Sequence, residues 1–266
     1  MNQNGQLELR HLLMGMRKDC KEILEYEREK DTSHIVYELK RSFNLNSAIV
    51  IYKNQLIITG GEKYQRNREA TKYTYRFHMK IDPITNNLQL QLDSHFPNLQ
   101  MNRSMHSAFV LNDHLFVMFG NQTGYEYYDL IKNPKQFTYK DFNEYLQFTR
   151  PLILPSEPAQ DKNEQEIIIL GENQFKKTRT KTLQFYKMQI NLQNQGEDKV
   201  PSIYIEEYIQ GPQMVCNFHQ NYPQQYYYQT TNEWLIMNEK GENCILDLKN
   251  HQVNYLNSRH PKEQQE

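Results

Sequence analysis

Short apolar runs separated by polar turns dominate the chain and predict β-strands rather than helices. Residues 47–61, SAIVIYKNQLIITGG, give an apolar run, a polar turn, a second apolar run and two glycines. Residues 103–121, RSMHSAFVLNDHLFVMFGN, repeat this order and end on a lone glycine. In 88–92, LQLQL, the leucines alternate with glutamines and fall on one face of an extended chain. Only 139–148, YKDFNEYLQF, has aromatic residues three apart that allow one or two helical turns.

The apolar run that ends in glycine recurs along the chain at unequal intervals of roughly 50 residues. It occurs at LLMG (12–15), FVMFG (116–120) and IIILG (167–171) as well as at the first glycine pair. After each glycine come a loop, a strand with aromatic residues, a polar turn and a further short strand. The last segment, 233–256, repeats the strands without the glycine. We therefore predict repeated small sheets in units at roughly 7–40, 42–95, 101–148, 149–210 and 212–256, followed by a polar tail at 257–266.

These residues resemble the kelch repeat of β-propellers. The family pattern is Arg-x-x-His, an apolar strand, a turn, a second apolar strand that ends in two glycines, then Tyr-Asp and a Trp. The matching positions are Arg103, His106, Gly120, Tyr128 and Asp129, with Phe137 where the family prefers Trp. The preceding unit keeps the complete pair, Gly60 and Gly61, whereas Gly15 and Gly171 each keep one glycine. The resemblance implies an all-β kelch-type propeller of about five four-stranded blades.

The first unit begins directly at its second strand, so the resemblance implies an incomplete first blade. Propellers protect their sheet edges by completing one blade with strands from both chain ends. Two arrangements remain open. Either a strand near the C-terminus, at about 253–256, fills the first blade, or these residues belong to a longer ring.

Composition and charge narrow the classes of partner. The formal net charge of the 266 residues is −1, which provides no long-range field for nucleic acid or an anionic membrane. The three cysteines, Cys20, Cys216 and Cys244, are odd in number and far apart, which favours a reducing compartment over a disulfide framework. The N-terminal residues carry neither a signal-peptide pattern nor a membrane span. We expect a cytoplasmic protein, with association with the cytoskeleton as one option, and neither nucleic-acid binding nor membrane insertion.

No catalytic or metal-binding motif stands out. The nine histidines show no metal-ligand spacing, and His106 belongs to the repeat pattern, which favours a structural role. No nucleophile elbow, phosphate-binding loop or dinucleotide motif is found. Asp129 matches the Asp of the kelch Tyr-Asp pattern, and the resemblance implies that this residue forms a turn or bridges two blades. We expect no catalytic residue, no metal and no cofactor.

The candidate binding residues lie on loops that would share one rim of a propeller, where binding usually resides. They are basic or polar: Arg66, Arg68, Arg103, Gln122, Thr123, Lys176, Lys177 and Arg179. The basic loop 175–181, FKKTRTK, is either a solvated face or a patch for an acidic partner. Similarly, the tyrosines of 221–231, NYPQQYYYQTT, are either core or part of an interface.

Three functions fit these features. The leading hypothesis is a non-catalytic protein-interaction scaffold whose rim receives an acidic or polar peptide segment of an unidentified protein partner. The second is a structural subunit of a large cytoskeletal or organellar assembly. The third is an enzyme, because some kelch-type propellers resemble sugar-acid isomerases or copper radical oxidases with sites at the channel mouth.

Overall fold

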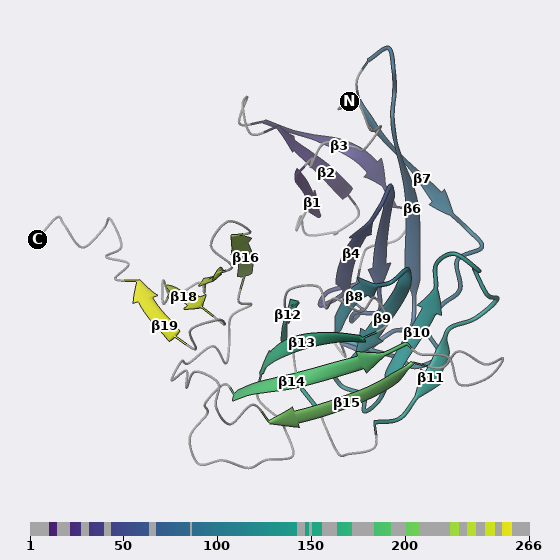
Figure 1. The fold of residues 1–266 in the computed structure, drawn as a ribbon. Helices are drawn as coiled ribbons and strands as arrows, with labels where there is room; N and C mark the ends of the chain where they lie inside the picture. Colours follow the sequence, from purple (N-terminus) through teal and green to yellow (C-terminus); the bar gives the residue numbers. More distant parts are fainter. Residues whose placement is uncertain are drawn as a thin grey trace, which may run out of the picture. The chain divides into compact units, whose positions relative to one another are not determined.

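Every regular element that the structure describes is a β-strand (Figure 1). The structure is a computed structural model, and it describes residues 11–14, 22–27, 32–39, 44–63, 68–85, 87–142, 147–148, 151–155, 164–171, 184–192, 201–207, 224–228, 233–237, 243–247 and 252–256. The chain divides into two compact units, residues 1–141 and 142–266. The described residues contain no helix that is long and apolar enough to span a membrane.

The first unit contains three antiparallel sheets built from consecutive strands. The first sheet has three strands, β1 (His11–Met14), β2 (Glu22–Glu27) and β3 (Thr32–Glu38). The second sheet consists of β4 (Ala48–Tyr52), β5 (Gln55–Thr59), β6 (Thr74–Ile81) and β7 (Leu88–Asp93). The third sheet consists of β8 (Ser107–Leu111), β9 (His114–Met118), β10 (Tyr125–Asp129) and β11 (Thr138–Lys140).

The second unit contains two four-stranded antiparallel sheets with the same sequential order. The fourth sheet consists of β12 (Leu152–Pro155), β13 (Glu164–Gly171), β14 (Gln184–Asn191) and β15 (Ser202–Glu207). The fifth sheet consists of β16 (Gln224–Tyr228), β17 (Glu233–Met237), β18 (Asn243–Asp247) and β19 (Gln252–Leu256).

Tight turns set the register of the hairpins. The turn between β8 and β9 has Asn112 at φ 45° and Asp113 at φ 63°. Positive φ at both central residues is the geometry of a type I′ turn, whose twist matches that of the flanking strands. Asparagine and aspartate tolerate this conformation better than most residues. The polar turns in the sequence are therefore the points at which each chain segment reverses.

In the second sheet, strand β5 is buried on both faces, which explains its continuous apolar run. Leu56 and Ile58 pack with Ile23 and Leu39, the last of which directly follows β3, in a core shared with the first sheet. On the opposite face, Ile57 packs in a second core shared with the third sheet. In the fourth sheet, residues 167–170 are likewise buried at successive positions. Strands that are buried on both faces have apolar residues at successive positions, whereas a half-exposed strand would alternate apolar and polar residues.

The structure confirms the all-β prediction and the small antiparallel sheets, four of which have four strands. The helical turns considered for 139–148 fall partly on 143–146, outside the described residues, while residues 138–140 form β11. Residues 252–256 form β19, which pairs with β18 from Asn243↔Leu256 to Asp247↔Gln252. Among the described strands, the first sheet has three.

Candidate binding cleft

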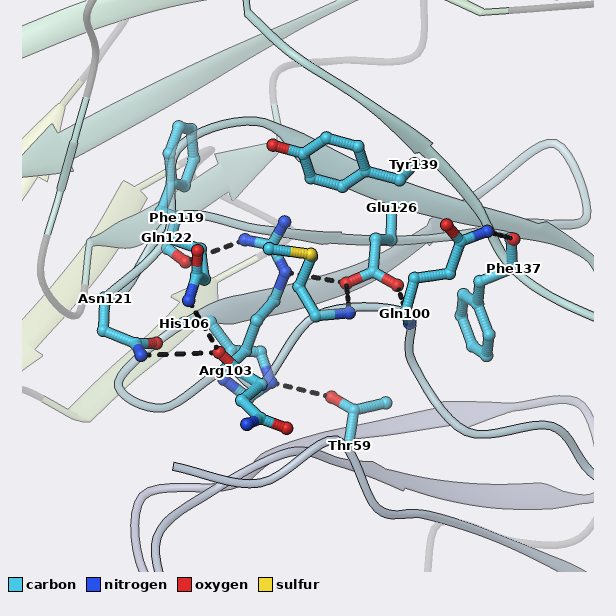
Figure 2. A network of polar contacts seen from close by, with 12 residues as sticks. Thr59, Gln100, Arg103, His106, Phe119, Asn121, Gln122, Glu126, Phe137 and Tyr139 are labelled. Atoms are coloured by element: carbon cyan, nitrogen blue, oxygen red, sulfur yellow. Dashed lines mark hydrogen bonds and ion pairs between the residues drawn. The ribbon is translucent and has the colours of Figure 1, made fainter. Parts of the chain in front are cut away.

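A fully buried ion pair between Arg103 and Glu126 anchors the loop that leads into β8 (Figure 2). Arg103 Nε donates to Glu126 Oε1 over 3.0 Å, and both side chains are 0% exposed. The same carboxylate accepts the backbone N–H groups of Gln100, at 2.5 Å, and Met101, at 3.3 Å. Arg103 Nη1 donates to the carbonyl of Phe119 over 3.1 Å. Because a buried charge pair is tolerated only with such additional hydrogen bonds, the loop is held firmly on the third sheet.

The backbone of the same loop is bonded to the second sheet. Arg103 N donates to the carbonyl of Thr71 over 2.9 Å, and its carbonyl accepts Gly61 N at 2.7 Å. Two residues later, Met105 N donates to the carbonyl of Asn46 over 3.2 Å. The loop 100–106 therefore joins the two sheets through its main chain, while the side chain of Arg103 is bonded to the third sheet.

His106 is a buried, neutral member of this junction. Its Nε2 lies 2.9 Å from Thr59 Oγ1 at the end of β5. Burial, followed by the positive charge of Arg103, lowers the pKa of His106 from 6.5 to about 3. At neutral pH the imidazole is therefore uncharged, and its contact with Thr59 connects the second and third sheets.

Glycine is required where the loops cross the ends of β5 and β9. Gly61 has φ 95°, and a Cβ there would meet Asn44 Cβ at 2.6 Å and the carbonyl of Leu45 at 2.7 Å. Gly120 has φ 82°, and a Cβ there would collide with the carbonyl of Ser104. Both the backbone conformation and the lack of space exclude a side chain at these positions. The close crossing that results brings the loops of two sheets together.

A polar cleft of about 440 Å³ opens where these loops meet. One wall is the connection from β5 to β6, and the other is formed by the segments before β8 and after β9. The lining residues are Lys63, Glu69, Ala70, Thr71, Lys72, Tyr73, Asn102, Asn121 and Gln122. The cleft is thus assembled from segments that are up to 59 residues apart in sequence, counted from Lys63 to Gln122.

Hydrogen bonds hold the carboxamide wall of the cleft in place. Gln122 Nε2 donates to the carbonyl of Asn102 over 3.1 Å, and Asn121 Nδ2 donates to the same carbonyl over 3.4 Å. Asn121 Oδ1 accepts Ser104 N at 2.8 Å. Both carboxamides are therefore hydrogen-bonded to the backbone of the neighbouring loop.

The charges of the cleft are nearly balanced. Lys63 Nζ lies 3.0 Å from Glu69 Oε2, and Lys63 N donates to the carbonyl of Glu69 over 3.0 Å, so this pair closes the base of its loop. The hydrogen bond that Lys63 donates to Glu69 raises the pKa of Lys63. Lys72 is exposed and forms no ion pair with the described residues, and Tyr73 beside it is 43% exposed. As far as the described residues show, the Lys72 ammonium group and the Tyr73 ring are therefore available to a ligand.

The structure places the expected rim residues in different environments. Gln122 lines the cleft, Thr123 follows it on the same loop, and Arg68 is exposed one residue before Glu69. Arg103 is completely buried against Glu126 and does not present its charge to a partner. The remaining candidates lie outside the described residues: Arg66, Lys176, Lys177 and Arg179.

The expected repeat positions are structural where the chain is described. Asp129 Oδ1 accepts the N–H groups of Ile131 and Lys132, both at 2.9 Å, and so shapes the turn after β10. Tyr128 is buried in the core shared with the second sheet. Gly60 has φ 59° under the same crossing loop, whereas Gly171 has no positive φ and packs near Phe148 and Pro151. Gly15 lies outside the described residues.

Sequence reasoning missed Glu126 and the residues Lys72, Tyr73 and Asn102 of the cleft. The signal for Glu126 was an acid flanked by tyrosines within strand β10, YEYYD, and an arginine elsewhere that needed a counter-charge. No sequence pattern pointed to Lys72, Tyr73 and Asn102. These residues come together in one cleft only because the second and third sheets pack against each other.

Within the described ranges, no three His, Cys, Asp or Glu residues form a group that could hold a metal ion. No protein-family model matches the chain, and no curated protein matches it.

Proposed function

We propose that this chain is a kelch-type β-propeller that acts as a non-catalytic protein-interaction scaffold and binds a peptide segment in the polar cleft. Each sheet of the first unit is built from consecutive antiparallel strands, and neighbouring sheets pack face to face through two separate cores. Repetition of this packing around an axis is what a propeller requires. The proposed ring would contain all five sheets.

The observation that carries the binding proposal is the prearranged carboxamide wall beside a free lysine and an exposed tyrosine. Carboxamides both donate and accept hydrogen bonds, as the backbone of an extended peptide does. Tyrosine and fixed loops on a rigid scaffold are typical of protein interaction sites. Lys72 adds a preference for a carboxylate in the bound segment, since no acidic residue of the described chain neutralises it.

A pull-down from native extract tests this proposal with a charge reversal inside the cleft. Lys72→Glu combined with Tyr73→Ala should abolish capture of the partner that the unaltered protein retains, with an unchanged melting temperature. The matched control is Lys80→Glu, an exposed lysine on β6 outside the cleft, which should capture the partner normally. Equal capture by both variants would remove the cleft from consideration.

A further inference from the structure

Ala70 lines the cleft between two neighbours that are hydrogen-bonded to the start of the same connection from β5 to β6. Before it, the carbonyl of Glu69 accepts Lys63 N at 3.0 Å. After it, Thr71 N donates to the carbonyl of Gly61 over 2.8 Å. These two bonds fix the orientation of the peptide groups on both sides of Ala70.

The main-chain groups of Ala70 itself point away from this neighbouring segment. In a planar trans peptide, the C=O of one residue and the N–H of the next point in opposite directions. The C=O of Glu69 is directed at Lys63, so the N–H of Ala70 is directed away from it. By the same rule, the C=O of Ala70 lies opposite to the N–H of Thr71. Among the described residues, neither group of Ala70 takes part in a hydrogen bond.

This free edge is short. Two residues further on, the carbonyl of Lys72 accepts Leu99 N at 3.0 Å, and the next carbonyl, that of Tyr73, accepts Gly60 N at 2.8 Å. Ala70 therefore offers one donor and one acceptor, which is what one hydrogen-bonded pair of an antiparallel ladder needs. A single residue of an extended segment can exchange two hydrogen bonds with it.

The opposite wall suits the other edge of such a segment. Asn102 lines this wall, and its own carboxamide group has no hydrogen bond to the described residues, although its carbonyl accepts Asn121 and Gln122. An extended chain directs alternate main-chain groups to its two sides. A carboxamide can donate to and accept from the groups that face it.

We infer that the peptide of the proposed function binds in an extended conformation and pairs the main chain of one of its residues with the N–H and C=O groups of Ala70. This mode of binding rests on the proposed function, because it describes how the same cleft holds its partner. Pairing of this kind recognises the backbone, so many side chains are accepted at the paired position. Proline is excluded there, because it has no N–H group.

Hydrogen exchange of the amides, followed by NMR on the whole protein, tests the state of this edge. Without a peptide, the Ala70 amide should exchange at least about tenfold faster than the Thr71 amide, which is bonded to Gly61. An Ala70 amide as protected as that of Thr71 would overturn the inference, since the chain would then already occupy this edge.

Peptides selected for the cleft provide the second test. A phage-displayed library of random peptides is selected on the whole protein and counter-selected on the variant that combines Lys72→Glu with Tyr73→Ala. The selected peptides are then synthesised with an N-methyl group at each position in turn. Methylation at the paired position should weaken binding by about tenfold, because it removes a hydrogen-bond donor and obstructs pairing. Methylation at the peptide ends serves as the control and should be tolerated.

The outcomes separate this inference from the proposed function. Binding of a selected peptide should slow exchange of the Ala70 amide by about tenfold or more. Peptides that depend on the cleft, yet tolerate methylation at every position or leave exchange at Ala70 unchanged, would overturn the inference and leave the proposed function standing. A library without any peptide that distinguishes the protein from the double variant would overturn both.

Discussion

Arg103 and Glu126, which are 23 residues apart, form a completely buried ion pair with 3.0 Å between Nε and Oε1. The pair fixes the loop that passes over the ends of two sheets and forms one wall of the polar cleft. Substitution of Glu126 therefore tests whether this ion pair holds the loop that forms one wall of the proposed binding cleft.

Glu126→Ala should destabilise the fold by about 3–5 kcal/mol, because it leaves the Arg103 guanidinium buried without its counter-charge. Urea denaturation of the variant and the parent protein measures the difference. The control is Glu69→Gln, which alters an exposed ion pair and should barely change the denaturation midpoint. A midpoint for Glu126→Ala close to that of the parent would show that the pair does not hold this loop.

His106 should make stability fall on acidification. Its pKa in the folded state is about 3, lowered mainly by burial, against 6.5 for the ordinary side chain. Between these values the unfolded chain binds a proton and the folded chain does not, so protonation favours unfolding as the pH falls from 6.5 toward 3. The contribution is about 1.4 kcal/mol per pH unit for one such group.

Denaturation curves at several pH values for His106→Asn and the parent protein isolate this effect. The variant should be less stable at pH 7 but lose stability less steeply as the pH falls. His95→Asn, at an almost fully exposed position, serves as the control and should retain the steep dependence. Parallel curves for His106→Asn and the parent would contradict a neutral, buried histidine.

Gly61→Ala should destabilise the protein by about 1–3 kcal/mol, because alanine is strained at φ 95° and its Cβ would meet the carbonyl of Leu45 at 2.7 Å. Thermal or urea unfolding measures the change. Gly171→Ala is the matched control, since that glycine has no positive φ. A Cβ at position 171 would lie 3.1 Å from a side-chain atom of Phe148 and 3.2 Å from one of Pro151. Equal losses at both glycines would show that the backbone conformation is not the cause.

Tyr52 and Asp113 should be coupled across the turns of two neighbouring sheets. The Tyr52 hydroxyl donates to Asp113 Oδ1, and this hydrogen bond, followed by that from Lys53, lowers the pKa of Asp113. A double-mutant cycle with Tyr52→Phe and Asp113→Asn should give a coupling free energy of about 0.5–1 kcal/mol. Additive effects of the two substitutions would mean that the contact contributes nothing to stability.

Local patterns predicted the strands well because each pattern reflects a short-range requirement. The polar pair Asn112 and Asp113 marked a hairpin, since both residues tolerate the positive φ that this turn imposes. The alternating leucines of LQLQL became β7, with Leu88 and Leu90 buried.

The candidate site was predictable only in part. Gln122 lines the cleft as expected of a loop residue, but Arg103, chosen for its charge, is buried. Exposure of a basic residue cannot be read from its type, because a counter-charge on a neighbouring strand can hold it in the core. Here that counter-charge is Glu126, which lies on β10 beyond the next hairpin.

By itself, the sequence determined that this protein is built from short strands and tight turns, with glycine where the second strand of a repeat ends. These features follow from the conformational limits of single residues and their immediate neighbours. Only the tertiary structure decided that Arg103 is buried, that Lys72 and Asn102 line one cleft, and that Ile49 and Ile51 are left exposed. Each of these properties depends on which sheet packs against which, and therefore on contacts between residues far apart in the chain.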